Sequence, residues 1–149
     1  MWRILIRILC IVTKIYFRFK KSNTFREGRK KYKMALHNEL GQRGEAVAVD
    51  FLISINHQIL ATNYRYKHAE IDIVSTIEKI VVFTEVKARS TDRFGFPEEA
   101  VSEKKQDKLM EAAQQYLEEN DIKTAFRFDV IAIVFEKGTP KIHHIPDAF

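Results

Sequence analysis

The sequence has almost no cysteine. Its one thiol, Cys10 among 149 residues, excludes an internal disulfide bond and is typical of a reducing compartment, so we expect a cytoplasmic protein. Cysteine and histidine groups with zinc-ligand spacing, glycine-rich phosphate loops and internal repeats are missing as well. These absences argue against a disulfide scaffold, a zinc finger, a P-loop nucleotide site and a repeat architecture.

Long hydrophobic runs are also missing. In residues 1–33 the longest uncharged run, residues 8–13, has six members, far fewer than the roughly 20 residues that cross a bilayer. Charged residues interrupt the apolar stretch and no small-residue cleavage site follows, which argues against a signal peptide. On a helical wheel the basic residues form a narrow stripe beside a broad apolar face. That pattern is typical of a helix lying on a membrane surface.

Positive charge is concentrated in the same segment. Residues 1–33 contain eleven Lys and Arg and one acid, whereas residues 34–149 contain fourteen Lys and Arg and nineteen acids. The formal charge of +5 therefore comes from a basic amphipathic extension, and the remaining single domain is acidic. Net charge consequently gives no support for DNA binding. The extension is either a peripheral membrane anchor or a segment upstream of a natural start at Met34, and the abrupt charge change favours Met34.

Residues 70–89 contain two apolar, β-branched runs joined by the short polar stretch 75–79. This pattern predicts two antiparallel strands in a hairpin. Because side chains alternate along a strand, Glu85 and Lys87 point to the same side, and the hairpin places Asp72 across from them. Two acids and an amine therefore converge on one face of an apolar sheet.

This combination suits metal-assisted hydrolysis of phosphodiesters. Carboxylates hold a hard divalent cation such as Mg²⁺ or Mn²⁺, the cation activates phosphate and water, and a lysine neutralises developing charge. Asp72, Glu85 and Lys87 are the candidates for these roles. The alternative is a surface ion pair between Glu85 and Lys87, with Asp72 opening its strand.

The remaining pattern predicts an α/β domain with a mixed sheet flanked by helices. In chain order we expect a helix at 37–55, a strand at 58–66, the hairpin, a loop at 88–97, a helix from the cap Ser102 to about Glu119, a strand at 125–135, a turn at 137–140 and a strand at 141–145. On the last strand, we expect His143 and His144 to be edge residues rather than metal ligands.

Two glycines, Gly41 and Gly44, lie in the first turns of the expected first helix. Each costs about 1 kcal/mol relative to alanine, so we expect them to allow close approach of a neighbouring element. Glu45 lies on the same glycine-lined edge. It is either a functional acid or a solvated acid near a helix N-terminus, where the helix dipole favours negative charge.

Local basic patches are needed if this acidic domain binds DNA. The candidate DNA contacts are Arg65, Lys67, Arg89, Arg93, Lys104, Lys105 and Lys108. The last three lie near the start of the second expected helix, where the helix dipole disfavours cations, so a phosphate partner would explain them. A solvated charged face, with Glu103 and Asp107 interleaved, is the alternative.

Six segments are distinctive in combination. They read LGQRGE at 40–45, NYR at 63–65, EID at 70–72, FTEVKAR at 83–89, FGFPEEA at 94–100 and RFDVI at 127–131. With these segments the domain resembles the YraN-like family of uncharacterised bacterial proteins, within the restriction-endonuclease-like PD-(D/E)xK nuclease superfamily. The resemblance covers the domain and excludes residues 1–33.

The resemblance implies a restriction-endonuclease-like αβββαββ core. It places Asp72 and Glu85 at the positions of the metal-binding acids and Lys87 at the position of the catalytic lysine. Glu45 corresponds to a first-helix acid that archaeal-type Holliday junction resolvases of this fold add to the metal site. Ala69 departs from the glycine that the family usually has before Glu-Ile-Asp.

The expected function is therefore a Mg²⁺- or Mn²⁺-dependent endonuclease acting on DNA, with branched or structured DNA as a candidate substrate by analogy of fold. DNA binding would use the local basic patches or a homodimer. A non-catalytic nucleic-acid-binding or interaction module of the same fold is one alternative. Membrane association through the N-terminal segment is another.

Overall fold

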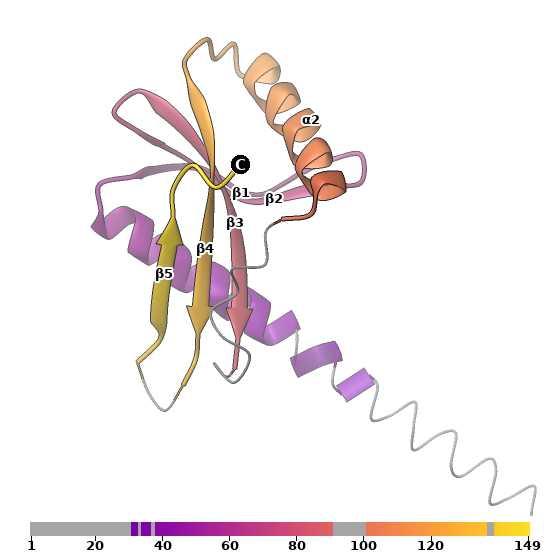
Figure 1. Cartoon of the computed structure of the whole chain (residues 1–149), viewed down its shortest axis with the longest axis vertical. Helices are drawn as coiled ribbons and strands as arrows, with labels where there is room; N and C mark the ends of the chain where they lie inside the picture. The colour runs from indigo at the N-terminus through magenta and orange to yellow at the C-terminus, as the bar shows by residue number, and fades with distance from the viewer. Residues whose placement is uncertain (1–30, 33, 37, 91–100, 137–138) are drawn as a thin grey trace, which may run out of the picture. The chain divides into compact units, whose positions relative to one another are not determined.

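The computed structural model describes residues 31–32, 34–36, 38–90, 101–136 and 139–149 (Figure 1). The chain divides into two compact units, Met1–Glu39 and Leu40–Phe149. The amphipathic pattern near the N-terminus and Arg93 lie outside the described residues. Across the part that is described, no helix combines the length and the apolar character needed to cross a membrane.

In the second unit, the described strands form one five-stranded sheet with the order β1-β2-β3-β4-β5. The strands are β1 (Gln58–Tyr66), β2 (Ala69–Ile77), β3 (Ile80–Arg89), β4 (Phe126–Val134) and β5 (Lys141–Ile145). Neighbouring strands are antiparallel except β3 and β4, which are parallel. A parallel pair needs a crossover, and helix α2 (Glu103–Glu119) lies in it. With the first helix, residues 40–54 of this unit, the expected restriction-endonuclease-like α/β fold class is confirmed.

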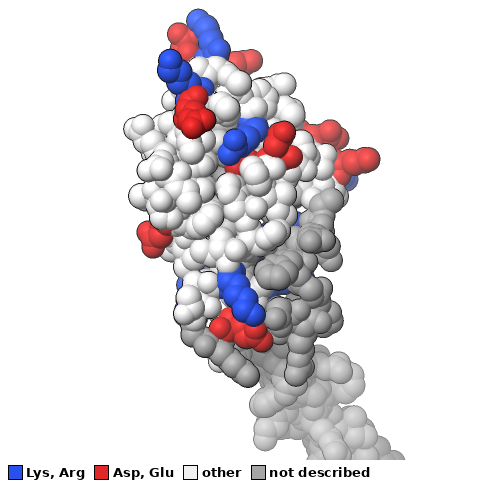
Figure 2. All heavy atoms as spheres, turned by 60° about the vertical axis from the view of Figure 1, so that its left-hand side comes forward, with Lys and Arg blue, Asp and Glu red and all other residues white. Residues whose placement is uncertain are grey.

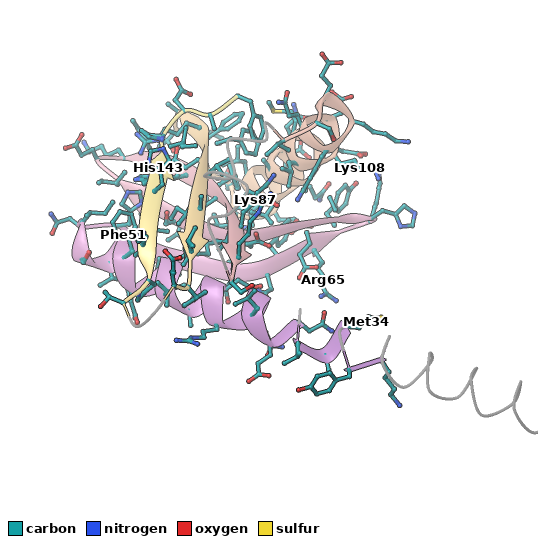
Figure 3. All side chains as sticks on the ribbon, turned by 60° about the horizontal axis from the view of Figure 1, so that its bottom comes forward. Met34, Phe51, Arg65, Lys87, Lys108 and His143 are labelled. Atoms are coloured by element: carbon teal, nitrogen blue, oxygen red, sulfur yellow. The ribbon has the colours of Figure 1, made fainter. Side chains whose placement is uncertain are left out.

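Helices cover both faces of the sheet (Figures 1 and 3). On one face, α2 buries Leu109, Ala112, Ala113 and Tyr116. On the other face, the first helix packs Ala48 and Leu52 against strand residues that include Ile73 and Ile131. The strand residues beneath each helix are consequently buried.

The turn between β2 and β3 is shorter than expected, so the prediction of a connection at residues 75–79 is wrong. Only Glu78 and Lys79 separate the strands, with φ values of 51° and 67°, the left-handed conformation of a two-residue type I′ turn. Ser75 instead remains in β2 and is fully buried, with its hydroxyl 3.0 Å from Nδ1 of His57. This buried partner allows a polar residue to continue the strand.

His144 is more than an edge residue. It lies on the edge strand β5, as expected, but its Nε2 is 2.8 Å from Oδ2 of the fully buried Asp129. Arg127 donates to both oxygens of the same carboxylate, at 2.9 and 3.2 Å, and the N–H of Asp147 donates at 3.1 Å. Burial alone would raise the pKa of Asp129, but these hydrogen bonds outweigh it and lower the pKa. The cluster fastens β5 and the following segment to β4.

Gly44 allows the close approach that the sequence predicted. A Cβ atom at this position would lie 2.5 Å from Cβ of Ala88 on β3, well inside the normal separation of non-bonded carbon atoms. At Gly41 no atom of another described element lies within 4 Å of the corresponding position, so the expectation is wrong there. The contact at Gly44 holds the first helix, with Glu45 next in the chain, against the end of β3.

Gly44→Ala is expected to lower the free energy of unfolding by about 1–3 kcal/mol, the usual cost of overpacking. Gly41→Ala is the matched control, because it occupies open space and should stabilise the helix by up to about 1 kcal/mol. Denaturant unfolding of both variants and the wild type measures the difference. Equal stability of the two variants would contradict the close approach at Gly44.

Candidate active site

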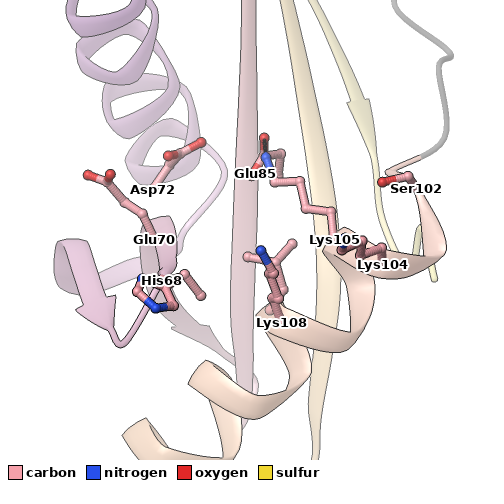
Figure 4. Close-up of a pocket in the computed structure, with 10 residues that line it drawn as sticks. His68, Glu70, Asp72, Glu85, Ser102, Lys104, Lys105 and Lys108 are labelled. Carbon is pink, nitrogen blue, oxygen red and sulfur yellow. Dashed lines mark hydrogen bonds and ion pairs between the residues drawn. The ribbon is translucent and has the colours of Figure 1, made fainter.

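A cavity of about 490 Å³ lies between β2, β3 and the first turns of α2 (Figure 4). It is lined by His68, Ala69, Glu70, Asp72, Glu85, Ser102, Lys104, Lys105, Lys108 and Leu109. The strands contribute the acids and α2 contributes the lysines, so opposite walls carry opposite charge. Two of the predicted metal ligands and three of the predicted DNA contacts therefore share one cavity.

Asp72 and Glu85 come together where β2 and β3 separate. The last paired residues on this side of the hairpin are Ile73 and Thr84, and the two acids are the next residues on each strand. Oδ2 of Asp72 accepts a hydrogen bond from the N–H of Val86 at 2.7 Å. The side chain of Glu85 is only 9% exposed. Two neighbouring carboxylates are thus largely removed from water.

The acids at this site repel one another. Burial raises the pKa of Asp72 to about 7, with repulsion from Glu85 as the second cause. The hydrogen bond from Val86 lowers this pKa, the charge of Glu45 raises it and that of Lys105 lowers it, with smaller effects. A cation would favour the ionised acids by removing the repulsion between them. The donor set therefore fits a hard divalent ion, whose usual ligands are carboxylate oxygens.

Lys105 forms an ion pair with Glu85 by reaching from α2 across the cavity (Figure 4). Its own side chain is 45% exposed. The sequence pattern marked Lys105 only as a DNA contact, because nothing in the pattern relates a helix residue to an acid 20 positions earlier. Within the described ranges, no three His, Cys, Asp or Glu side chains form a group that could already hold a metal ion. That result agrees with the orientation of Glu85 toward Lys105.

Glu45 and Glu70 extend the acidic group. Glu45, on the first helix, accepts a hydrogen bond from Nδ2 of Asn63 at 2.8 Å. Glu70 forms an ion pair with Arg65 at 2.9 Å. Burial, and then repulsion from Glu70, raises the pKa of Glu45. Glu45 is therefore close enough for its charge to interact with the other acids, although it does not line the cavity.

Lys87 follows Glu85 by two residues on β3 and is half-buried. Strand alternation places both side chains on the same face of the sheet as Phe83, which packs with the buried residues of α2. Lys87 is not among the residues that line the cavity. Its catalytic role stays a prediction.

The other predicted DNA contacts are distributed differently. Arg65 pairs with Glu70, and Lys67 pairs with Glu111 on α2. Arg89 is the last residue of β3. Over the described residues of the face in Figure 2, basic and acidic side chains lie next to one another rather than in one basic area. The lysines of the cavity wall are therefore the strongest candidates for a phosphate contact.

Two further residues at the site, His68 and Asn63, were not identified from the sequence pattern. His68 lines the cavity from the turn between β1 and β2. Asn63, which holds Glu45, belongs to the NYR segment whose role the motifs alone do not define. The presence of asparagine inside an otherwise regular strand pattern is the one hint that a search could have used.

Comparison with known proteins identifies the family. Residues 44–133 match the model of the uncharacterised protein family UPF0102. A UPF0102 protein of Christiangramia forsetii is 45% identical over 116 residues, which cover 78% of this chain and 98% of the relative. The chain belongs to the UPF0102 family. UPF0102 proteins of Geobacter metallireducens and Clostridioides difficile are 42% identical over 118 residues and 44% identical over 115 residues. These alignments cover 78% and 76% of this chain, and 97% and 98% of the relatives.

The UPF0102 match confirms the YraN-like resemblance that the motifs indicated. Its range begins at Gly44 and ends at Ile133 on β4. It therefore includes Glu45, the three acids that line the cavity and the lysines of α2. The region common to the UPF0102 family is the region that builds the site.

Proposed function

We propose that this UPF0102 member is a Mg²⁺- or Mn²⁺-dependent nuclease that hydrolyses phosphodiester bonds in DNA, with branched or otherwise structured DNA as its substrate. The observation that carries the proposal is a single cavity in which Asp72 and Glu85 face the lysines of α2. One wall suits a divalent cation and the other suits a phosphate, and metal-assisted phosphodiester hydrolysis needs both together. The choice of branched DNA rests on analogy of fold alone.

Each residue of the cavity has a role in this proposal. Asp72 and Glu85 would hold the cation through their carboxylate oxygens. A bound Mg²⁺ or Mn²⁺ supplies polarisation of a phosphoryl oxygen and a more acidic coordinated water. Lys104 and Lys108 would contact phosphate oxygens from the opposite wall.

Lys105 would exchange partners when the site is filled. An ammonium group and a divalent cation repel each other at one carboxylate, so ligation by Glu85 would release Lys105. The released side chain belongs to the same wall as Lys104 and Lys108 and would bind phosphate with them. Lys105 would therefore neutralise the carboxylate of Glu85 in the metal-free protein. In the metal-bound protein it would neutralise a phosphate of the substrate.

Lys105→Met is expected to tighten Mn²⁺ binding by about two- to fivefold, because a partly exposed ion pair contributes up to about 1 kcal/mol and competes with the metal. Lys104→Met is the control, since it removes the same charge from the neighbouring position. Isothermal titration calorimetry measures both affinities, and Lys104→Met should show the smaller change. Unchanged or weaker Mn²⁺ binding by Lys105→Met would contradict the exchange.

The proposed activity is tested by incubating the protein with branched, flapped, single-stranded and linear DNA, in Mg²⁺, in Mn²⁺ and in chelator. We expect cleavage only with metal, fastest on a structured substrate, and none by Asp72→Asn. Binding to these substrates without any cleavage would refute the nuclease proposal. It would favour the non-catalytic nucleic-acid-binding alternative.

A further inference from the structure

Asn63 has an unusual backbone conformation in the middle of a strand. It lies within β1, yet its φ is 54°, in the left-handed region where residues other than glycine are uncommon and asparagine is among the most tolerant. The strand pairs on either side place Asn63 level with Asp72 of β2. The irregular backbone is therefore next to an acid of the site rather than at a strand end.

The side chain of Asn63 connects β1 to the first helix. Its Nδ2 donates to Oε2 of Glu45 at 2.8 Å. Glu45 follows Gly44, where the first helix lies too close to Ala88 of β3 to leave room for a Cβ atom. An amide donor on one carboxylate oxygen fixes the orientation of the group and leaves the lone pairs of the second oxygen for another partner. Asn63 and Gly44 together thus determine where the carboxylate of Glu45 lies.

We propose that Asn63 is a positioning residue that orients Glu45 as a further ligand of the cation held by Asp72 and Glu85. This inference rests on the proposed function, because it concerns the same metal site. Residues that hydrogen bond to metal ligands typically change metal affinity by about 10- to 100-fold when they are removed. The left-handed backbone at Asn63 then serves to direct its amide at Glu45.

Asn63→Gly separates the side chain from the backbone. Glycine adopts a positive φ readily, so this variant should fold and melt near the wild-type temperature in chelator. Its Mn²⁺ affinity, measured by calorimetry, is expected to fall by about 10- to 100-fold. Asn56→Gly is the matched control, because Asn56 also has a left-handed backbone, with φ 69°, but follows the first helix at its far end. It should bind Mn²⁺ as the wild type does.

Glu45→Gln completes a double-mutant cycle. If Asn63 acts through Glu45, adding Asn63→Gly to Glu45→Gln should not lower the Mn²⁺ affinity further. Wild-type affinity in Asn63→Gly would overturn the inference, as would an equal loss in both backgrounds. Failure of the wild type itself to bind Mn²⁺ would refute the proposed function, so the two failures are distinguishable.

Discussion

Lys87→Ala is expected to slow metal-dependent DNA cleavage by about 10²- to 10³-fold, the usual effect of removing one preorganised charge-stabilising group. Lys87 shares a face of β3 with Glu85, where an ammonium group would stabilise negative charge that develops on the phosphate. The same variant should bind Mn²⁺ almost as the wild type does, because a lysine ammonium group has no lone pair with which to bind a metal ion. Cleavage and metal binding are therefore expected to respond separately.

Single-turnover cleavage and Mn²⁺ calorimetry on the same preparations measure this separation. Lys123→Ala is the matched control, since Lys123 is exposed, pairs with Asp121 and lies beyond the C-terminal end of α2. It should leave both quantities unchanged. A loss of Mn²⁺ affinity in Lys87→Ala as large as its loss of cleavage would contradict the assigned role.

Asp72→Asn is expected to keep or raise stability in chelator and to lower stability, relative to the wild type, when metal is present. In chelator the variant should be as stable as the wild type or more stable, because it removes one of the repelling carboxylates and keeps an oxygen that can accept the N–H of Val86. With metal the wild type should gain stability by mass action, about 1.4 kcal/mol at ten times the dissociation constant. The variant should lose most of that gain.

The stability of the metal-free protein should also depend on pH through Asp72. Its pKa is raised to about 7 in the folded protein, whereas an unfolded aspartate has a pKa of about 3.9. Between these values the folded state holds a proton that the unfolded state has released, so rising pH destabilises the fold. Asp72→Asn lacks this contribution, so at pH 7 in chelator the variant should be more stable by up to about 4 kcal/mol.

Denaturant unfolding of both proteins at pH 4, 5.5 and 7, in chelator, tests the pH dependence. Melting of both proteins at pH 7, in chelator and in excess Mg²⁺ or Mn²⁺, tests the metal dependence. If Asp72 had a structural role instead, Asp72→Asn would lower the free energy of unfolding by the same amount under all of these conditions. Absence of a metal-dependent shift in the wild type would show that the site does not hold a cation.

Local patterns were sufficient to predict the elements of the fold. The strands β1 and β5 have the expected bounds, and α2 begins after Ser102 and ends at Glu119, as expected. These elements have strong periodicity and clear boundaries. The error at Ser75 has a physical cause, because its burial depends on His57, 18 positions earlier in the chain. Patterns within a short window do not contain such a partner.

The candidate site could be predicted only where its residues are close in sequence. Asp72 and Glu85 were placed together because a hairpin joins their strands. The ion pair of Lys105 with Glu85 and the hydrogen bond of Asn63 to Glu45 join different elements, and they depend on how helices pack on the sheet. The left-handed backbone of Asn63 is hinted at only by the presence of an asparagine within the strand pattern.

Paramagnetic broadening by Mn²⁺ tests the central claim, a cation held by Asp72 and Glu85, most directly. Small amounts of Mn²⁺ are added to isotopically labelled protein, and the loss of each backbone amide signal is followed by NMR. The amides of Asp72, Glu85 and Val86 should broaden first, and Asp72→Asn should abolish this selective loss. The account would be contradicted if the first signals to broaden were those around Asp129, a buried carboxylate outside the cavity. It would also be contradicted if no amide signals broadened selectively.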